Sequence, residues 1–150
     1  MGLAQDLDTI IEAAKILKDY NIRFVFIGEG VCKQKIMSLA KPYMNKISFY
    51  EPLPRMELIK FIKKASICIV PLKDRKLFKS ALPSKMFEYM ACERPLIVGI
   101  KGEAEKLIRN AKAGIAIEPE NPDKLSKAIL TYYNNSQKCK VDGKNGLRYI

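Results

Sequence analysis

The feature of this sequence that most constrains its fold is the alternation of short apolar runs with stretches of helical periodicity. Residues 22–27 and 66–70 are β-rich and almost entirely apolar, whereas residues 3–20 place apolar side chains at the spacing of one helix face. Apolar strands that alternate with helices are typical of a parallel sheet covered on both faces. We therefore predict one α/β domain over residues 1–150, with a doubly wound, Rossmann-like parallel sheet.

The same criteria assign the remaining elements. We predict helices over residues 3–20, 31–40, 56–64, 84–91, 103–110 and 123–133, and strands over residues 22–27, 46–50, 66–70, 96–98 and 115–117. Residues 72–82 form the longest predicted loop. The first element is a helix, although a βαβ unit normally opens with a strand, so we expect the preceding strand to lie outside this chain.

Composition and charge exclude several classes of function. The chain has no histidine, which excludes a histidine-based triad, and its four cysteines show no CxxC pair, so we expect no metal site. Cys68 and Cys92 are expected in the core of a reduced, cytoplasmic protein. The net charge of +11 favours anionic partners: nucleic acid, anionic lipid or phosphorylated small molecules.

Ligands of parallel α/β sheets bind beyond the carboxyl ends of the strands. Segments 28–30, 50–54, 71–85 and 99–103 occupy these positions in the predicted order. Gly28 and Gly30 could form a phosphate-binding turn, or only a tight turn. A dinucleotide fingerprint would need a third glycine where Lys33 stands, so we do not expect an NAD-type site.

The helix after the long loop carries the most specific pattern. Pro83 and Ser84 start it, so its free N–H groups could hold a phosphate, with Lys85 adding a positive charge. Glu88 lies one turn on, where a carboxylate could accept hydrogen bonds from ribose hydroxyls. The residues expected to pack this helix on the sheet are Met86, Phe87 and Met90. An ordinary amphipathic helix capped by Ser84 or Pro83 is the alternative.

The segment from Ser66 to Ile108 resembles the signature region of the group 1 glycosyltransferases, which have the GT-B fold. The resemblance rests on Ala-Ser-Ile-Cys-Ile-Val-Pro-Leu, on Ala-Leu-Pro-Ser-Lys-Met-Phe-Glu-Tyr-Met-Ala-Cys-Glu-Arg-Pro-Leu-Ile-Val, and on Gly-Glu-Ala-Glu-Lys-Leu-Ile. Other parts of the chain match in the same order, including Phe24–Gly30, Ile47–Leu58 and Asn121–Leu125. The Pro-Ser-Lys-x-Phe-Glu-Tyr version resembles transferases of amino- and deoxy-sugars in surface polysaccharide assembly.

The resemblance implies that this chain is the C-terminal, nucleotide-sugar-binding half of such an enzyme, truncated at both ends. The residues it implies for a UDP- or GDP-sugar are Gly28, Gly30, Pro52, Leu53, Ser80, Pro83, Ser84, Lys85 and Glu88. It implies transfer to a glycan or lipid-linked acceptor without a metal or other cofactor. The acceptor domain, and any general base, would lie outside this chain, so we expect the fragment to bind nucleotide without turnover. Peripheral contact with the inner face of the cell membrane is a further hypothesis.

Two departures from the family pattern concern the donor. Ser80 stands where the first glutamate of the Glu-x7-Glu motif touches the donor sugar in many relatives, so Ser80 or Lys79 is expected to contribute instead. A Lys-Gly step that helps grip the diphosphate appears as Gln5-Asp6. On this resemblance, we expect Lys85 and the helix N-terminus to supply the positive charge that binds the diphosphate.

Two functions of other classes remain open at this point. A nucleic-acid-binding module would account for the charge, but it should place aromatic residues among basic ones on a defined surface, and the one hint of this is Tyr132 and Tyr133 near Lys138 and Lys140. We therefore expect no nucleic acid partner. A non-catalytic regulatory α/β domain would need a switch residue, and no acidic phosphoacceptor cluster follows a first strand.

Overall fold

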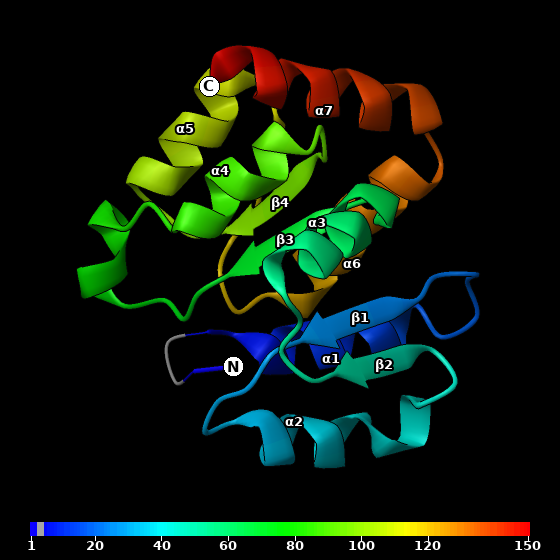
Figure 1. Ribbon diagram of the computed structural model, residues 1–150. Coiled ribbons are helices and arrows are strands. Elements are labelled where there is room, and N and C mark those ends of the chain that lie inside the picture. The colour runs from blue at the N-terminus through cyan, green and yellow to red at the C-terminus, as the bar shows by residue number, and fades with distance from the viewer. Residues whose placement is uncertain (3–4) are drawn as a thin grey trace.

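The computed structural model describes residues 1–2 and 5–150, over which helices and strands alternate up to residue 133 and a further helix follows at residues 136–149 (Figure 1). The strands are β1 (Phe24–Ile27), β2 (Ile47–Tyr50), β3 (Cys68–Pro71), β4 (Leu96–Gly99) and β5 (Gly114–Ala116). The α-helices are α1 (Leu7–Ile16), α2 (Lys33–Ala40), α3 (Arg55–Lys64), α4 (Ser84–Ala91), α5 (Glu103–Ala111), α6 (Pro122–Tyr133) and α7 (Ser136–Tyr149). Two short 3-10 helices, η1 (Lys41–Tyr43) and η2 (Lys76–Ser80), lie in the loops.

Every strand pairing is parallel, which confirms the predicted fold class. The hydrogen-bonded strands form two ladders, β1–β2 and β3–β4–β5. Within the residues that the structure describes, no ladder joins β1 to β3, so the sheet is interrupted between these two strands. A doubly wound sheet of strand order 3-2-1-4-5-6 would have its first strand at this place. The facing edges of β1 and β3 therefore have no strand between them in the described chain.

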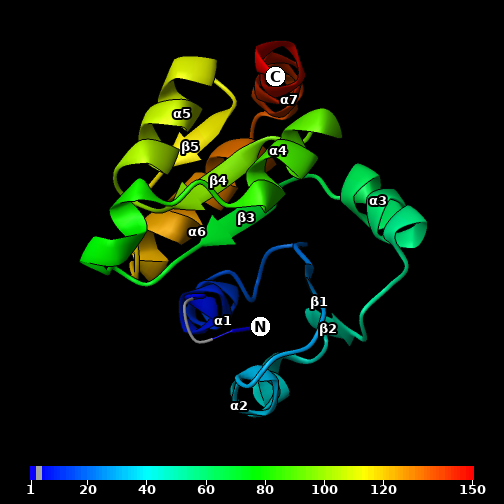
Figure 2. The same cartoon turned by 60° about the vertical axis from the view of Figure 1, so that its left-hand side comes forward.

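The strand β4 shows why the chain needs helices on both faces. Leu96, Ile97 and Val98 are fully buried. Leu96 and Val98 pack into the core formed with α4 and α5, whereas Ile97 faces the core formed with α1 and α6. Figure 2 shows this ladder between α4 and α5 on one side and α6 on the other. A strand that is apolar on both faces is stable only in such a layer.

The predicted bounds agree closely with the structure except at the ends of several elements. The helix predicted from residue 3 begins at Leu7, after Asp6, and its predicted start at Leu3 lies outside the described residues. It ends at Ile16, because residues beyond Leu17 form turns that close on Lys15 and Leu17. The predicted loop 72–82 contains η2, which the periodicity did not indicate.

The last helix, α7, was not among the predicted elements. Its sequence has few apolar side chains, and it packs against α4, α5, α6 and β5 through small residues instead. A Cβ added at Gly143 would overlap the backbone carbonyl of Glu93. Asn135 caps the helix by accepting a hydrogen bond from the Lys138 N–H at 3.0 Å. The glycine and the cap, rather than an apolar stripe, define this helix.

The cysteines are all unpaired thiols: Cys32, Cys68, Cys92 and Cys139. Cys68 is buried as predicted, and this burial raises the pKa of its thiol to about 12. The prediction for Cys92 was wrong, because its side chain is only half-buried where α4 ends. Among the helices of the described residues, none is long and apolar enough to cross a membrane.

Asp6 is a buried carboxylate between two segments that are far apart in the sequence. Its Oδ2 accepts the backbone N–H of Glu120 at 3.1 Å, which ties the start of α1 to the loop before α6. Burial raises the pKa of Asp6 above its ordinary value of 3.8, although a hydrogen bond with Thr9 opposes the shift. The fold therefore disfavours the ionised form of this side chain.

We expect the Asp6→Asn variant to gain stability relative to the wild type as pH rises. A raised pKa means that the stabilisation is fully present below pH 3.8 and is lost as pH rises through the higher native pKa. Asparagine keeps an acceptor for the Glu120 N–H and carries no charge at any pH. Urea denaturation of both proteins at about pH 3.5 and about pH 7 measures the difference in the free energy of unfolding. A difference that is the same at both pH values would contradict this prediction.

Candidate donor-binding site

The loop between β3 and α4 brings several predicted site residues to one end of the sheet. The strands β1, β2 and β3 point the same way, and α4 begins at that edge (Figure 1). Met86 and Met90 are fully buried against the sheet, as predicted, and they fix the rotation of α4. The prediction for Phe87 was wrong: its side chain is 38% exposed, because it lies one position round the helix from the buried pair.

The N-terminus of α4 has no side-chain cap; in its first turn the Met86 N–H donates to the Pro83 carbonyl at 3.0 Å. Pro83 occupies the N-cap position without a side-chain hydrogen bond, and the first turn contains no acidic residue. Of the two caps that the alternative named, Pro83 does occupy the N-cap position, whereas Ser84 is the first residue of the helix. By contrast, Asn121 caps α6 by accepting the Lys124 N–H at 2.9 Å. The Ser84 and Lys85 N–H groups at the start of α4 remain available to an anion, with the exposed Lys85 side chain beside them.

Glu88 projects from α4 toward α3. Its Oε1 lies 3.6 Å from Nη1 of Arg55, the first residue of α3, and 36% of the Glu88 side chain is exposed. A cavity of about 100 Å³ adjoins this pair. Its lining is formed by Arg55, Leu58, Ile59, Ile62, Glu88, Ala91 and Cys92. Glu88 thus presents a carboxylate at the mouth of an apolar hollow, one turn from a helix start that attracts anions.

The glycine turn after β1 lies beside the loop after β2. The Gly28 N–H donates to the Tyr50 carbonyl at 3.1 Å, and Tyr50 immediately precedes the loop that contains Pro52 and Leu53. Gly28 and Gly30 have φ values of 128° and 153°, which side chains disfavour. Pro52 is exposed and Leu53 half-buried, so both are accessible from the ends of the strands.

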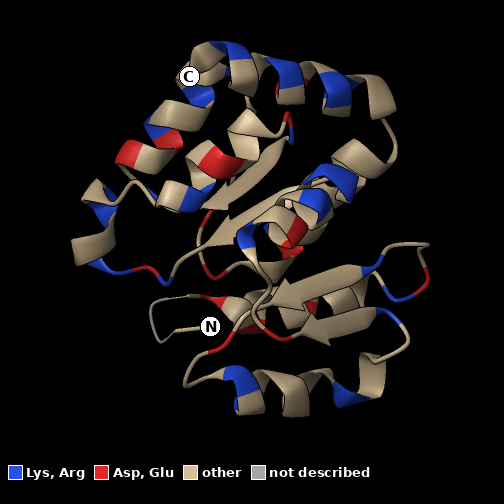
Figure 3. Ribbon diagram, viewed as in Figure 1, with Lys and Arg blue, Asp and Glu red and all other residues tan. Residues whose placement is uncertain are grey.

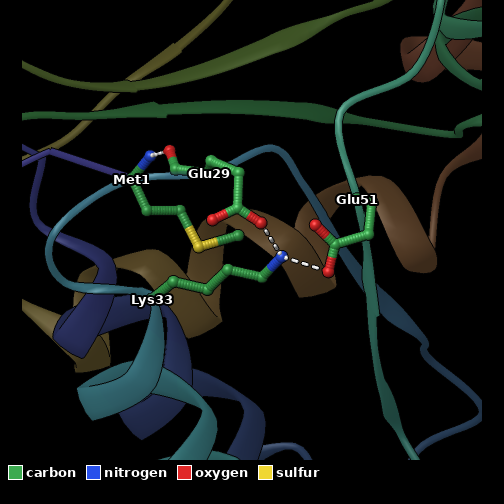
Figure 4. A network of polar contacts seen from close by, with 4 residues as sticks. All are labelled: Met1, Glu29, Lys33 and Glu51. Atoms are coloured by element: carbon green, nitrogen blue, oxygen red, sulfur yellow. Dashed lines mark hydrogen bonds and ion pairs between the residues drawn. The ribbon is translucent and has the colours of Figure 1, made fainter.

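Lys33 joins these two loops, which sequence reasoning did not foresee. Its Nζ lies 2.7 Å from Glu29 Oε1 and 3.0 Å from Glu51 Oε1, while only 7% of its side chain is exposed (Figure 4). Figure 4 also shows Met1, whose amino group contacts the Glu29 carbonyl. Hydrogen bonds to Glu29 and Glu51 raise the pKa of Lys33, so the ammonium stays charged. The spacing of Glu29 and Lys33, four residues apart, was the only available signal.

Replacing Lys33 with methionine should loosen the loop after β2. The change leaves the carboxylates of Glu29 and Glu51 near each other without a cation. We expect the Gly28 amide, which donates to the Tyr50 carbonyl between the two loops, to exchange with solvent about tenfold faster, since local opening becomes easier. The control is Lys35→Met. Lys35 lies on the same helix as Lys33, and its replacement removes only an exposed ion pair with Asp8 of α1. Exchange rates that stay unchanged in Lys33→Met would contradict this role.

The predicted residues therefore fall into two groups at one edge of the sheet. Gly28, Gly30, Pro52 and Leu53 lie beyond β1 and β2, whereas Pro83, Ser84, Lys85 and Glu88 lie at the start of α4. Ser80 is the exposed last residue of η2, in the loop that leads to α4. Arg55 joins the groups, because it follows the loop after β2 and pairs with Glu88. No sequence spacing indicated this pair.

Comparison with known proteins places this geometry in a family. The family model described as "Glycosyl transferases group 1" matches residues 2–148. An uncharacterized glycosyltransferase of Methanocaldococcus jannaschii is 30% identical over 146 residues, which cover 95% of this chain and 39% of that protein. A putative colanic acid biosynthesis glycosyl transferase of Escherichia coli is 25% identical over 132 residues, covering 86% of this chain and 32% of that protein.

A solved structure shows the same fold. HepE of Anabaena, crystallised with UDP and glucose, superposes with a TM-score of 0.82 over 99% of this chain and 40% of that chain, at 13% identity. Such low identity supports the fold alone. The chain thus spans about two fifths of the length of the first of these relatives and of this structure.

Proposed function

This chain belongs to the group 1 glycosyltransferases, and from that premise we propose that it binds the nucleotide-sugar donor of such an enzyme. The chain spans 39% of the Methanocaldococcus jannaschii relative, so the activity of a whole enzyme is part of the proposal. In this proposal the chain is the C-terminal half of a GT-B enzyme, and a second domain holds the acceptor.

The observation that carries the proposal is the start of α4. A helix N-terminus without a cap or an acidic first turn offers N–H groups and a positive dipole end to a diphosphate. Lys85 adds a mobile cation, and Glu88 offers a carboxylate to two neighbouring hydroxyls, as a ribose presents. A phosphate group and a ribose are joined in every nucleoside diphosphate, so one ligand can satisfy both features.

The two loops beyond β1 and β2 complete the proposed site. Gly28 and Gly30 let a ligand approach the backbone closely, and Pro52 and Leu53 offer an apolar surface to a nucleobase. UDP and GDP are the candidate nucleotides. The complex of HepE with UDP and glucose supports UDP as the first to test. Ser80 is the proposed sugar contact in the loop before α4.

The reaction proposed for the whole enzyme is sugar transfer from the nucleotide to a glycan or lipid-linked acceptor. The helix N-terminus and Lys85 would stabilise the charge that develops on the leaving diphosphate, so that no metal ion is required. The name of the Escherichia coli relative supports an acceptor in surface polysaccharide assembly. Amino- and deoxy-sugars are the proposed donor class, from the Pro-Ser-Lys-x-Phe-Glu-Tyr pattern of the helix.

The proposed location is the cytoplasm, with peripheral contact at the inner face of the cell membrane. The net charge of +11 supports this, because cationic surfaces are attracted to anionic lipids. Co-sedimentation with liposomes tests it: binding should increase with the fraction of anionic lipid. Equal binding to neutral and anionic liposomes would refute the membrane contact and leave the donor site unaffected.

Calorimetric titration with UDP, GDP and ADP tests the donor site directly. We expect measurable binding of UDP or GDP, with one base preferred and ADP weaker than both. Folding is checked in the same samples by circular dichroism. A folded protein that binds none of the three nucleotides would refute the proposal.

A further inference from the structure

A second hollow lies at the same edge of the molecule, beyond the ends of β3, β4 and β5. It is small, with a volume of about 10 Å³, which is room for one oxygen atom or water molecule. The loop before α4 contributes Lys73, Arg75, Phe78 and Lys79 to its wall, the loop before α5 contributes Ile100 and Lys101, and the loop before α6 contributes Pro119. Cations from separate loops therefore converge on a space that can hold a single polar atom.

The positive charge at this hollow is only partly neutralised. Lys101 Nζ lies 3.5 Å from Glu118 Oε1. Over residues 1–2 and 5–150, four charged residues of the wall form no ion pair: Lys73, Asp74, Arg75 and Lys79. Glu120 also lies beside the hollow, because its Oε2 accepts the Asp74 N–H at 3.1 Å. The cations Lys73, Arg75, Lys79 and Lys101 still outnumber the carboxylates Asp74, Glu118 and Glu120, which leaves positive charge that an anion could neutralise. Figure 3 marks the basic residues of this loop in blue.

The loop that carries these cations has a defined conformation. The Arg75 N–H donates to the Lys73 carbonyl at 2.9 Å, and the Phe78 N–H donates to the Arg75 carbonyl at 2.9 Å. Gly102, at the start of α5, lies so close to the loop that a Cβ there would overlap the Lys79 carbonyl. The backbone that carries the cations is therefore held against the start of α5, which lowers the entropy that the loop loses when an anion binds.

We propose that this hollow binds a carboxylate or phosphate group carried by a substrate, in addition to the diphosphate bound at α4. The inference rests on the proposed function, because the hollow lies in the loop that joins β3 to α4. It extends that function by naming a substrate class: either the donor sugar bears a carboxylate, as a uronic acid does, or the acceptor bears a phosphate. Both groups present the same anionic oxygen to Arg75 and Lys79.

The test is a titration of the ¹⁵N-labelled protein with glucuronate and, separately, with glycerol 3-phosphate, at constant ionic strength. Saturable shifts of the Lys79, Lys101 and Gly102 amides are expected with at least one of them. In Arg75→Gln and Lys79→Gln the dissociation constant should rise about fivefold, since a charged hydrogen bond is lost. The matched control is Lys76→Gln, because Lys76 is exposed on the same η2 but does not line the hollow.

The two ligands distinguish the sources of the anion. Tighter binding of glucuronate supports an acidic donor sugar, tighter binding of glycerol 3-phosphate supports a phosphorylated acceptor, and equal binding supports the shared oxyanion site. Non-saturating shifts with both ligands, or an equal loss in Lys76→Gln, would overturn the proposal. Titrations of Arg75→Gln with UDP and GDP test whether the hollow is separate from the nucleotide site. Unchanged nucleotide affinity supports a separate anion site, and lost nucleotide affinity overturns the proposal.

Discussion

Replacing Glu88 with glutamine is expected to weaken binding of the preferred nucleotide about 30-fold. Glutamine matches glutamate in size but offers one acceptor oxygen instead of two, and it carries no charge. The loss of charged hydrogen bonds to ribose hydroxyls should cost about 2 kcal/mol. Calorimetric titration of the wild type and the variant measures the change.

A nucleotide that lacks the ribose hydroxyls separates the loss of ribose contact from other effects of the Glu88→Gln substitution. If Glu88 binds the hydroxyls, a nucleotide without the 2′- and 3′-hydroxyls should bind weakly to the wild type and lose nothing more in Glu88→Gln. The control Glu57→Gln removes an acid from the first turn of α3 and should leave binding unchanged. Arg55→Gln breaks the exposed ion pair with Glu88, a contact that contributes little by itself. Full affinity in Glu88→Gln would contradict the assignment.

Replacing Gly143 with alanine should lower the free energy of unfolding by about 2–3 kcal/mol, although alanine is the better helix former. The helix α7 lies against the backbone after α4, and a Cβ at residue 143 would overlap the Glu93 carbonyl. A backbone atom cannot move away as a flexible side chain can, so α7 must shift. Urea denaturation of the two proteins measures the difference.

Gly146, three residues further along the same helix, provides the matched control. A Cβ there would lie 3.2 Å from Met90 Cγ and 3.3 Å from Ala113 Cβ, and the methionine side chain can adjust. We expect Gly146→Ala to change stability by less than about 1 kcal/mol, because the gain in helix propensity offsets mild crowding. Equal losses for both variants would mean that the close approach at Gly143 is not the cause.

The sequence predicted those parts of the fold that depend on local pattern. The bounds of α4 were predicted correctly, because Pro83 and the spacing of Met86 and Met90 are local signals. The parallel pairing followed from strands that are apolar on both faces. By contrast, α7 was not predicted, since its packing depends on the absence of side chains at Gly143 and Gly146 rather than on an apolar stripe.

The site shows the same division between local and distant information. The glycine turn and the start of α4 could be found from motifs, but the contacts that join them could not. Lys33 was noticed only as a departure from a glycine fingerprint, yet it bridges Glu29 and Glu51. Arg55 and Glu88 are separated by a strand and a long loop, so their pairing depends on how α3 packs near α4. Contacts of this kind require the tertiary structure.

The interruption between β1 and β3 has a consequence for how the molecule opens. Backbone hydrogen bonds tie strands together within each ladder, and over the described residues none of the ladder bonds crosses from one ladder to the other. The two parts are joined by apolar packing, in which α1 contacts α6, by the hydrogen bond from the Glu120 N–H to Asp6, and by the ion pair of Arg55 with Glu88. Side-chain packing can yield at one boundary while the hydrogen bonds on either side persist. We therefore expect the amides of the ladder with β1 and β2 to exchange faster than those of β3, β4 and β5, which native-state hydrogen exchange measures.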